Sequence, residues 1–223
     1  MSTEADIRKE LTLYGKKIVQ KGLVVATGGN ISARKGNIVY LSPGGFTLDE
    51  IAEGQWAKVE LKTGKIIKPI LKPTCEINMH LICYRTREDI GAVVHTHPPY
   101  VTGVVSAGVK IKPMFPDYVA YLGEEVPLLQ YITPAGNELA KAIGKIIGKY
   151  NAISLKNHGA LTVGSNLKEA FHRSMILEEA AKILFISKIM GTPGIFNPSE
   201  VKKIKNLVAE VHRQKLPYLF KDN

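Results

Sequence analysis

The sequence predicts an α/β protein in which a mainly antiparallel or mixed central sheet is covered by helices. Three observations predict this class. Pairs of short apolar or β-branched runs are separated by turns that contain glycine, which is typical of hairpins. Longer segments carry apolar residues at helical spacing. Few segments have the strand–helix–strand order of a parallel sheet, so we expect helices packed on a sheet built largely of hairpins.

The chain is expected to form a single domain. It has 223 residues, of which 45% are hydrophobic and 22% charged, and no linker interrupts it. We therefore expect one domain over residues 1–223, with a C-terminal helical extension after about residue 191. The polar, acidic start is unlike a signal peptide, and no apolar run approaches the roughly 18 residues of a membrane span. These features predict a cytoplasmic protein that does not bind membranes.

The formal net charge of +10 raises the question of a nucleic-acid partner. However, the 30 Lys and Arg residues are scattered, and no basic segment is interleaved with aromatic residues that would stack on bases. We therefore expect no nucleic-acid binding; an anionic small substrate or a lysine-rich surface explains the charge. Cys75 and Cys83 lack the spacing of a redox or metal motif, and we expect both to be reduced.

The N-terminal third begins with a predicted helix. Thr3 and Asp6 have capping-box spacing, apolar residues follow on one face, and Gly22 ends the pattern. Turns with glycine then separate paired apolar runs. We expect, in order, a strand over 23–26, a hairpin of 30–33 with 38–41, a short helix capped by Thr47 and Glu50, and a hairpin of 56–61 with 65–70.

The rest of the chain alternates between helices and strands. Pro73 and Thr74 are expected to open a helix that runs to about Arg85. In residues 109–125 the apolar residues follow neither helical nor strand spacing. The remaining expected elements are a strand over 90–97, a helix from Pro98 or Pro99 to Val105, a strand over 126–131, a helix over 134–149, a strand and turn over 152–163, a helix over 166–189 capped by Asn166, and a final basic helix from Asn197.

Three histidines indicate a metal site. His95 and His97 end an apolar, β-branched run, and side chains two apart on a strand point to the same face. His158, in a second strand-and-turn stretch, could supply the third ligand of an open catalytic zinc site. The alternative is that the His-x-His pair packs or hydrogen-bonds inside the core.

The start of the helix after Pro73 indicates an anion site. Free amides and the positive end of the helix dipole collect there, which suits phosphate binding by Thr74 and Cys75 and favours an ionised Glu76. The alternative is that Glu76 only complements the dipole. His80 lies one turn further on the same face, where we interpret it as a packing or supporting residue rather than a ligand.

The order of these motifs resembles the class II aldolase and epimerase family, which also contains the adducin head. The resemblance covers about residues 6–190, and it implies a three-layer α/β/α fold. It rests on five motifs: Thr-Gly-Gly-Asn-Ile-Ser at 27–32, Leu-Ser-Pro-Gly-Gly at 41–45, Lys-Pro-Thr-Cys-Glu at 72–76, His-Thr-His at 95–97 and Asn-His-Gly at 157–159.

The resemblance implies a zinc-dependent aldolase of the L-fuculose 1-phosphate type. Such an enzyme cleaves a ketose 1-phosphate to dihydroxyacetone phosphate and an aldehyde through an enediolate that the metal stabilises. By position, His95, His97 and His158 would hold Zn²⁺, with Mn²⁺ or Co²⁺ as possible substitutes. Glu76 would be the general base. Thr27, Asn30, Gly45, Thr74 and Cys75 would bind the phosphate.

The sequence departs from the aldolase pattern in the phosphate motifs. The family has a Ser-Ser pair before the glutamate and a threonine before the second glycine, whereas this chain has Thr74-Cys75 and Gly44. Because a thiol is a poor hydrogen-bond donor, the contact from Cys75 is expected to be weak.

The resemblance also implies a homo-oligomer, expected to be a tetramer, whose active sites are shared between subunits. A tyrosine acts there as a proton donor. Tyr118 matches its position best and Tyr121 is the rival, and the alternative is that both are packing residues.

Within the family, Glu76 favours an aldolase over L-ribulose-5-phosphate 4-epimerase, in which aspartate is usual. Methylthioribulose-1-phosphate dehydratases share the glutamate and stay an alternative. The adducin head is the non-enzyme alternative, but retention of the three histidines with Glu76 argues against a binding module.

Overall fold

A computed structural model describes residues 3–67 and 71–207 of the chain. Eight strands form one sheet in the order β4-β3-β2-β1-β5-β8-β7-β6. Every neighbouring pair is antiparallel except β6 and β7, which are parallel. The strands are β1 (Asn30–Lys35), β2 (Ile38–Leu41), β3 (Ala57–Glu60), β4 (Ile66–Ile67), β5 (Ala92–Thr96), β6 (Leu128–Leu129), β7 (Ala152–Leu155) and β8 (Gly159–Gly164).

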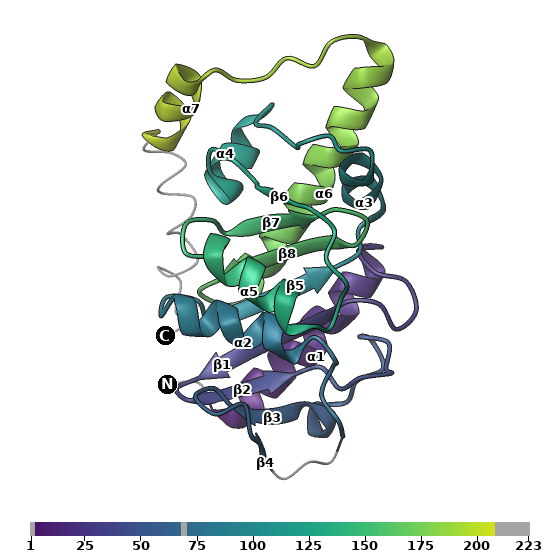
Figure 1. Ribbon diagram of the computed structural model, residues 1–223, viewed down its shortest axis with the longest axis vertical. Coiled ribbons are helices and arrows are strands. Elements are labelled where there is room, and N and C mark those ends of the chain that lie inside the picture. The colour runs from purple at the N-terminus through teal and green to yellow at the C-terminus, as the bar shows by residue number, and fades with distance from the viewer. Residues whose placement is uncertain (1–2, 68–70, 208–223) are drawn as a thin grey trace, which may run out of the picture.

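Helices cover both faces of the sheet, as predicted for an α/β fold. Figure 1 shows α2 and α5 on one face and α1 and α6 on the other, with α3 beside α6 and with α4 and α7 beyond the β7 and β6 end. Each group encloses its own buried apolar cluster. The helices are α1 (Glu4–Gln20), α2 (Ile77–Thr86), α3 (Pro99–Ser106), α4 (Pro116–Leu122), α5 (Asn137–Ile146), α6 (Leu167–Met190) and α7 (Pro198–Lys205), with a 3₁₀ turn at Glu53–Gln55.

The centre of the sheet brings three distant segments to one edge. Strand β5 lies between β1 and β8, with Asn30 opposite His95 and Thr96 opposite Ala160. Because both neighbours run antiparallel to β5, its C-terminal end meets the starts of β1 and β8. The glycine turn before β1, the His-Thr-His stretch and the turn between β7 and β8 therefore adjoin.

Local signals explain most of the predicted elements. Thr3 and Asp6 form the capping box of α1, and Asn166 and Asn197 cap α6 and α7 by accepting hydrogen bonds from backbone amides. Both predicted hairpins form, from β1 with β2 and from β3 with β4. Residues 68–70 of the second hairpin and 208–223 of the C-terminal extension lie outside the described residues.

Three expectations about elements are corrected, and one stretch without an expected element contains a helix. The predicted strand over 23–26 is a turn, in which Ala26 adopts a left-handed φ of 51°. The segment from Thr47 is also a turn, closed by a hydrogen bond from the Glu50 amide to the Thr47 carbonyl. Helix α2 begins at Ile77, after the residues expected in its first turn, because Glu76 is its N-cap. The aperiodic stretch over 109–125 contains α4, which begins at Pro116.

No helix among residues 3–67 and 71–207 is both long and apolar enough to cross a bilayer.

Candidate active site

The three histidines predicted to bind a metal converge at this edge of the sheet. His95 is the last residue but one of the fully buried strand β5, His97 directly follows the strand, and His158 lies in the turn between β7 and β8. Their ring nitrogens offer one ligand atom each, and these atoms lie within 4.8 Å of one another. The Nε2 atoms of His95 and His97 are 3.0 Å apart.

The environment of His95 fits a bound cation. Its Nδ1 lies 2.9 Å from the carbonyl oxygen of Ala160, so Nδ1 carries the hydrogen and, in the neutral ring, Nε2 carries a lone pair. That lone pair faces Oε2 of Glu76 at 3.2 Å and the His97 ring. Electron pairs so close repel one another unless a positive charge lies between them. The donor set, three imidazoles beside a carboxylate, suits a divalent metal.

Two glycines let the backbone approach the histidine rings. A Cβ at Gly159 would lie 2.3 Å from the carbonyl oxygen of Thr96 and 2.9 Å from the His97 ring. A Cβ at Gly28 would lie 2.9 Å from Nδ1 of His97. The glycines of both motifs are therefore required where the turns close on His97.

Burial keeps two of the histidines neutral. It lowers the pKa of His97 and of His158 to about 4, and the neighbouring His95 adds to the effect. Both rings are therefore unprotonated at neutral pH, the form in which imidazole binds metals.

Glu76 faces the histidine cluster from the start of α2. Its Oε2 accepts a hydrogen bond of 2.8 Å from the Asn30 amide, and its Oε1 lies 3.5 Å from Nε2 of His158. Burial alone would raise the pKa of Glu76, but positive charge at the His95 position and the hydrogen bond from Asn30 hold it well below its ordinary value. The side chain is therefore a carboxylate that can accept a proton or bind a metal.

The residues predicted to bind phosphate surround this cluster unevenly. Asn30 contacts Glu76 directly, and the Thr74 hydroxyl accepts a hydrogen bond from the Glu76 amide. Cys75 is exposed beside them. Thr27 and Gly45 are exposed on the two glycine turns, and the turn at Gly44 packs against the backbone of Pro73 and Thr74.

Tyr118 is not brought to the histidines. It is fully buried in the cluster that joins α3, α4, α6 and α7, and its hydroxyl donates a 3.0 Å hydrogen bond to the carbonyl of Ile111. Its ring would have to leave this core to reach a neighbouring subunit. Tyr121, one turn along α4, is only half-buried and lies beside His172 at a small surface cavity.

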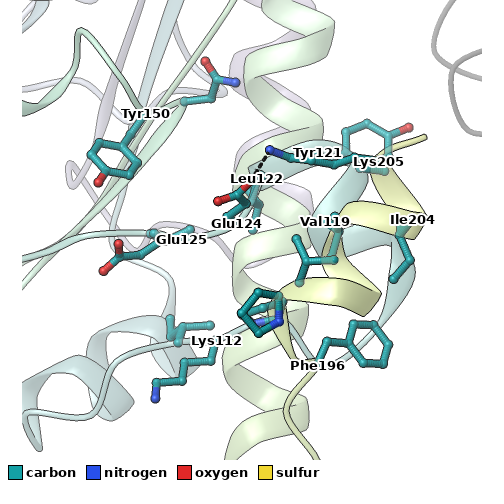
Figure 2. A pocket seen from close by; sticks show the side chains of 18 of the residues that line it. Lys112, Val119, Tyr121, Leu122, Glu124, Glu125, Tyr150, Phe196, Ile204 and Lys205 are labelled. Carbon is teal, nitrogen blue, oxygen red and sulfur yellow. Dashed lines mark hydrogen bonds and ion pairs between the residues drawn. The ribbon is translucent and has the colours of Figure 1, made fainter. Parts of the chain in front are cut away.

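A larger cavity, of about 1300 Å³, lies elsewhere in the molecule. Figure 2 shows Tyr121, Glu124, Tyr150 and Lys205 around it, with an ion pair between Glu124 and Lys205. Its lining includes Tyr150 and Asn151, which precede β7, whereas His158 follows the other end of that strand. The cavity is thus separate from the histidine cluster.

Sequence reasoning did not identify Ser32 and Tyr84 behind Glu76. His80, which was interpreted as a packing or supporting residue, contacts Asn30 and Ser32, and Tyr84 contacts Ser32. A signal for this group exists in the sequence. Glu76, His80 and Tyr84 are spaced by four residues, and Asn30 and Ser32 by two, as on one helix face and one strand face.

Comparisons with known proteins identify the family to which the chain belongs. The model of the family "Class II Aldolase and Adducin N-terminal domain" matches residues 9–185. A 5-deoxy-D-ribulose 1-phosphate aldolase of Bacillus thuringiensis is 35% identical over 88% of this chain and 92% of its own length. An L-fuculose phosphate aldolase of Methanococcus maripaludis is 36% identical over 78% and 91%.

One solved structure and one further relative are also similar to this chain. A solved structure named L-fuculose 1-phosphate aldolase superposes with a TM-score of 0.85 at 31% identity, over 92% of this chain and 96% of its own. A 3-oxo-tetronate 4-phosphate decarboxylase of Pectobacterium atrosepticum is 32% identical over 83% of this chain and 87% of its own length. On the strength of the family match and these relatives, the chain belongs to the class II aldolase and adducin N-terminal domain family, and it is a lyase.

Proposed function

We propose that this enzyme cleaves a ketose 1-phosphate of the L-fuculose 1-phosphate type to dihydroxyacetone phosphate and an aldehyde. The observation that carries the proposal is the convergence of His95, His97 and His158 on one point that the Glu76 carboxylate also faces. A Lewis acid beside a base is what carbon–carbon cleavage next to a carbonyl requires.

In this proposal His95, His97 and His158 hold one Zn²⁺ per chain. When bound, the metal would act as a Lewis acid that polarises the substrate carbonyl and lowers the energy of negative charge on its oxygen. Mn²⁺ and Co²⁺ suit the same three imidazoles and are the alternative ions for this site.

Glu76 is proposed to move the proton at carbon. In cleavage, Glu76 accepts the proton of the C4 hydroxyl, the C3–C4 bond breaks as C4 becomes the aldehyde carbonyl, and the electron pair of that bond forms the enediolate of dihydroxyacetone phosphate. Glu76 then gives a proton to C3; in the reverse direction it removes that proton. The low pKa of Glu76 supports the direction of removal, because the free enzyme carries the carboxylate form.

The phosphate is proposed to lie against Thr74, Asn30, Gly45, Thr27 and Cys75. Asn30 donates one amide hydrogen to Glu76, so its second hydrogen is the one left for a substrate oxygen. Backbone amides of the two glycine turns would supply the remaining donors. The exposed Cys75 thiol adds little, since it is a weak donor.

A second candidate activity is decarboxylation of a 3-oxo acid phosphate. The Pectobacterium atrosepticum relative named as such a decarboxylase favours it. Loss of CO₂ next to a carbonyl also leaves an electron pair conjugated with that carbonyl, so the same metal site would serve. Epimerisation at C4 and dehydration, the alternatives from the sequence, follow related chemistry.

One substrate panel separates aldol cleavage, epimerisation and decarboxylation. The zinc enzyme is incubated with L-fuculose 1-phosphate, 5-deoxy-D-ribulose 1-phosphate, L-ribulose 5-phosphate and 3-oxo-tetronate 4-phosphate, while dihydroxyacetone phosphate, C4 epimer and CO₂ are measured separately. We expect dihydroxyacetone phosphate from one or both ketose 1-phosphates, loss of turnover with chelator, and no adduct trapped by borohydride. Epimer or CO₂ without cleavage contradicts the aldolase proposal, and a trapped lysine adduct contradicts the metal mechanism.

A further inference from the structure

A chain of buried polar side chains leads from Glu76 into the protein core. Oδ1 of Asn30 lies 2.5 Å from Nε2 of His80, and Nδ1 of His80 lies 2.7 Å from the hydroxyl of Ser32. That hydroxyl lies 2.7 Å from the hydroxyl of Tyr84. All four side chains are buried, His80 and Ser32 completely. Buried polar groups are costly unless each is hydrogen-bonded, and here every link is made.

Hydrogen-bond chemistry fixes the direction of every link. The Glu76 carboxylate can only accept, so Asn30 must present its NH₂ group to it and its Oδ1 to His80. Nε2 of His80 must then donate. Burial lowers the pKa of His80 to about 3, so the ring is neutral and its Nδ1 accepts a hydrogen bond from Ser32. The oxygen of Ser32 in turn accepts the hydroxyl hydrogen of Tyr84.

Asn30, at one end of these hydrogen-bonded side chains, binds only one oxygen of the Glu76 carboxylate. Asn30 binds Oε2, whereas Oε1 is buried and without a hydrogen-bond partner among the described residues. Because the amide of Asn30 is itself held by His80, the carboxylate cannot rotate without breaking the directed chain. Oε1 is thereby left toward His158 and the histidine cluster.

We propose that Asn30, His80, Ser32 and Tyr84 are positioning residues that hold the Glu76 carboxylate in the orientation needed for proton transfer. The inference rests on the proposed function of Glu76. The directed chain predicts that His80 is present as the Nε2–H tautomer and that disruption at Ser32 reaches Glu76 through two intervening side chains.

The first test determines, without any substrate, the direction of the hydrogen bonds that His80 makes. In the ¹⁵N-histidine-labelled zinc enzyme at pH 7, ¹⁵N–¹H correlation spectra should show His80 as the neutral Nε2–H tautomer. The spectrum of Ser32→Ala should keep this tautomer, because Nε2 still donates to Asn30, but the Nδ1 resonance should shift, because Nδ1 loses its donor. Ser154→Ala is the matched control, since Ser154 is a buried serine of β7 whose hydroxyl has no partner among the described residues. An Nδ1–H tautomer in the wild-type spectrum overturns the inference.

The second test reads the effect on Glu76. The side-chain carboxyl ¹³C resonance, assigned with Glu76→Gln, should shift in Ser32→Ala and stay in place in Ser154→Ala. In turnover, Ser32→Ala and His80→Leu should lower kcat roughly 10- to 100-fold with KM nearly unchanged, as for other residues that orient a reactive group through a hydrogen bond. His80→Gln should recover part of this loss, because its amide can donate to Asn30.

The outcomes separate this inference from the proposed function. A Glu76 resonance that does not move in Ser32→Ala, or wild-type kcat in folded His80→Leu, overturns the positioning role. If no ketose phosphate is turned over, the proposed function fails. The His80 tautomer and the Glu76 carboxyl resonance still show whether the hydrogen-bonded side chains orient Glu76. If the variants do not fold, the tautomer of His80 in the wild type decides its direction.

Discussion

The short contacts around Glu76 are the features of single residues that matter most for the chemistry. Its carboxylate lies 3.2 Å from Nε2 of His95, beside the proposed metal site. Because three imidazoles suffice to hold the metal, removal of the Glu76 charge should change catalysis more than metal binding. We predict that Glu76→Gln keeps stoichiometric metal and loses roughly 10²-fold or more in kcat, the usual contribution of a positioned acid–base group. Elemental analysis beside steady-state kinetics checks both halves. Unchanged kcat with metal bound would exclude Glu76 as the base.

The histidine cluster makes a second prediction at this scale. His95→Ala and His158→Ala should each lose most of the bound metal, because two imidazoles are too few for tight binding. His172→Ala is the matched control: this half-buried histidine of α6 packs beside Tyr121 and Phe171, outside the cluster, and its replacement should leave the metal content near one per chain. Stoichiometric metal surviving in His95→Ala would contradict the site.

His80 predicts how stability depends on pH. Its pKa falls from 6.5 to about 3 on folding, so below pH 6.5 the unfolded chain binds a proton that the folded chain does not. The contribution of neutral His80 to the free energy of unfolding is therefore fully present above about pH 6.5 and is lost as the pH is lowered toward 3. We expect the metal-free enzyme to lose roughly 2 kcal/mol more between pH 7 and pH 5 than His80→Gln does. Urea unfolding at both pH values measures this, and equal losses would show that His80 is charged in the fold.

Residue types and spacing predicted that the three histidines would converge, but not all of the side chains that support Glu76 beside them. The spacing of His95 and His97 is fixed by strand geometry alone, and both rings reach His158 as expected. By contrast, the link from Asn30 to His80 depends on how α2 packs over β1, which no local pattern encodes. Tyr118 was assigned from the family resemblance, and its burial follows from the packing of α4 on α6.

The turn between β7 and β8 is the element on which the site depends most closely. A Cβ at Gly159 would overlap the carbonyl of Thr96 and touch the His97 ring, so Gly159→Ala must displace one of them. We predict a loss of about 1–3 kcal/mol in stability and weaker metal binding. Gly103→Ala, on α3 where a Cβ meets open space, should be neutral or slightly stabilising. Calorimetry and metal titration of the two variants test this, and equal behaviour would count against it.

At the level of elements, periodic patterns were reliable and short apolar runs were not. The hairpins and the long α6 helix carry repeated signals and were predicted. The run at 23–26 forms one strand-like bond, from the His97 amide to the Leu23 carbonyl, but then turns at Ala26. A run of four residues does not distinguish the two outcomes.

The whole molecule carries apolar surface that a monomer would leave in water. Ile189 and Met190 at the end of α6 are 67% and 82% exposed, beside the half-exposed Phe185. This surface is what a homo-oligomer would cover; the tetramer with shared active sites stays a prediction from the family resemblance. Sedimentation of the zinc enzyme at micromolar concentration should show a species several times the mass of 24.5 kDa per chain. A monomer at that concentration would contradict the prediction.

Shared sites can be tested by mixing subunits. If Tyr118 or Tyr121 donates a proton at a neighbour's site, then Glu76→Gln mixed with the corresponding Tyr→Phe variant should regain activity, because some sites combine two intact halves. The burial of Tyr118 leads us to expect recovery with Tyr121→Phe. Recovery with Tyr118→Phe alone would restore the assignment from the sequence, and no recovery despite subunit exchange would exclude both.

The central claim is that the histidine cluster and Glu76 together move a proton on dihydroxyacetone phosphate. The most direct measurement is hydrogen exchange, followed by NMR, when the zinc enzyme is incubated with dihydroxyacetone phosphate in D₂O and no aldehyde is present. We predict that one hydrogen of the hydroxymethyl carbon exchanges in the wild type, and that Glu76→Gln with its metal bound slows the exchange roughly 10²-fold or more. Absence of exchange in the metal-loaded wild type, or exchange at the full rate in Glu76→Gln, would contradict the account.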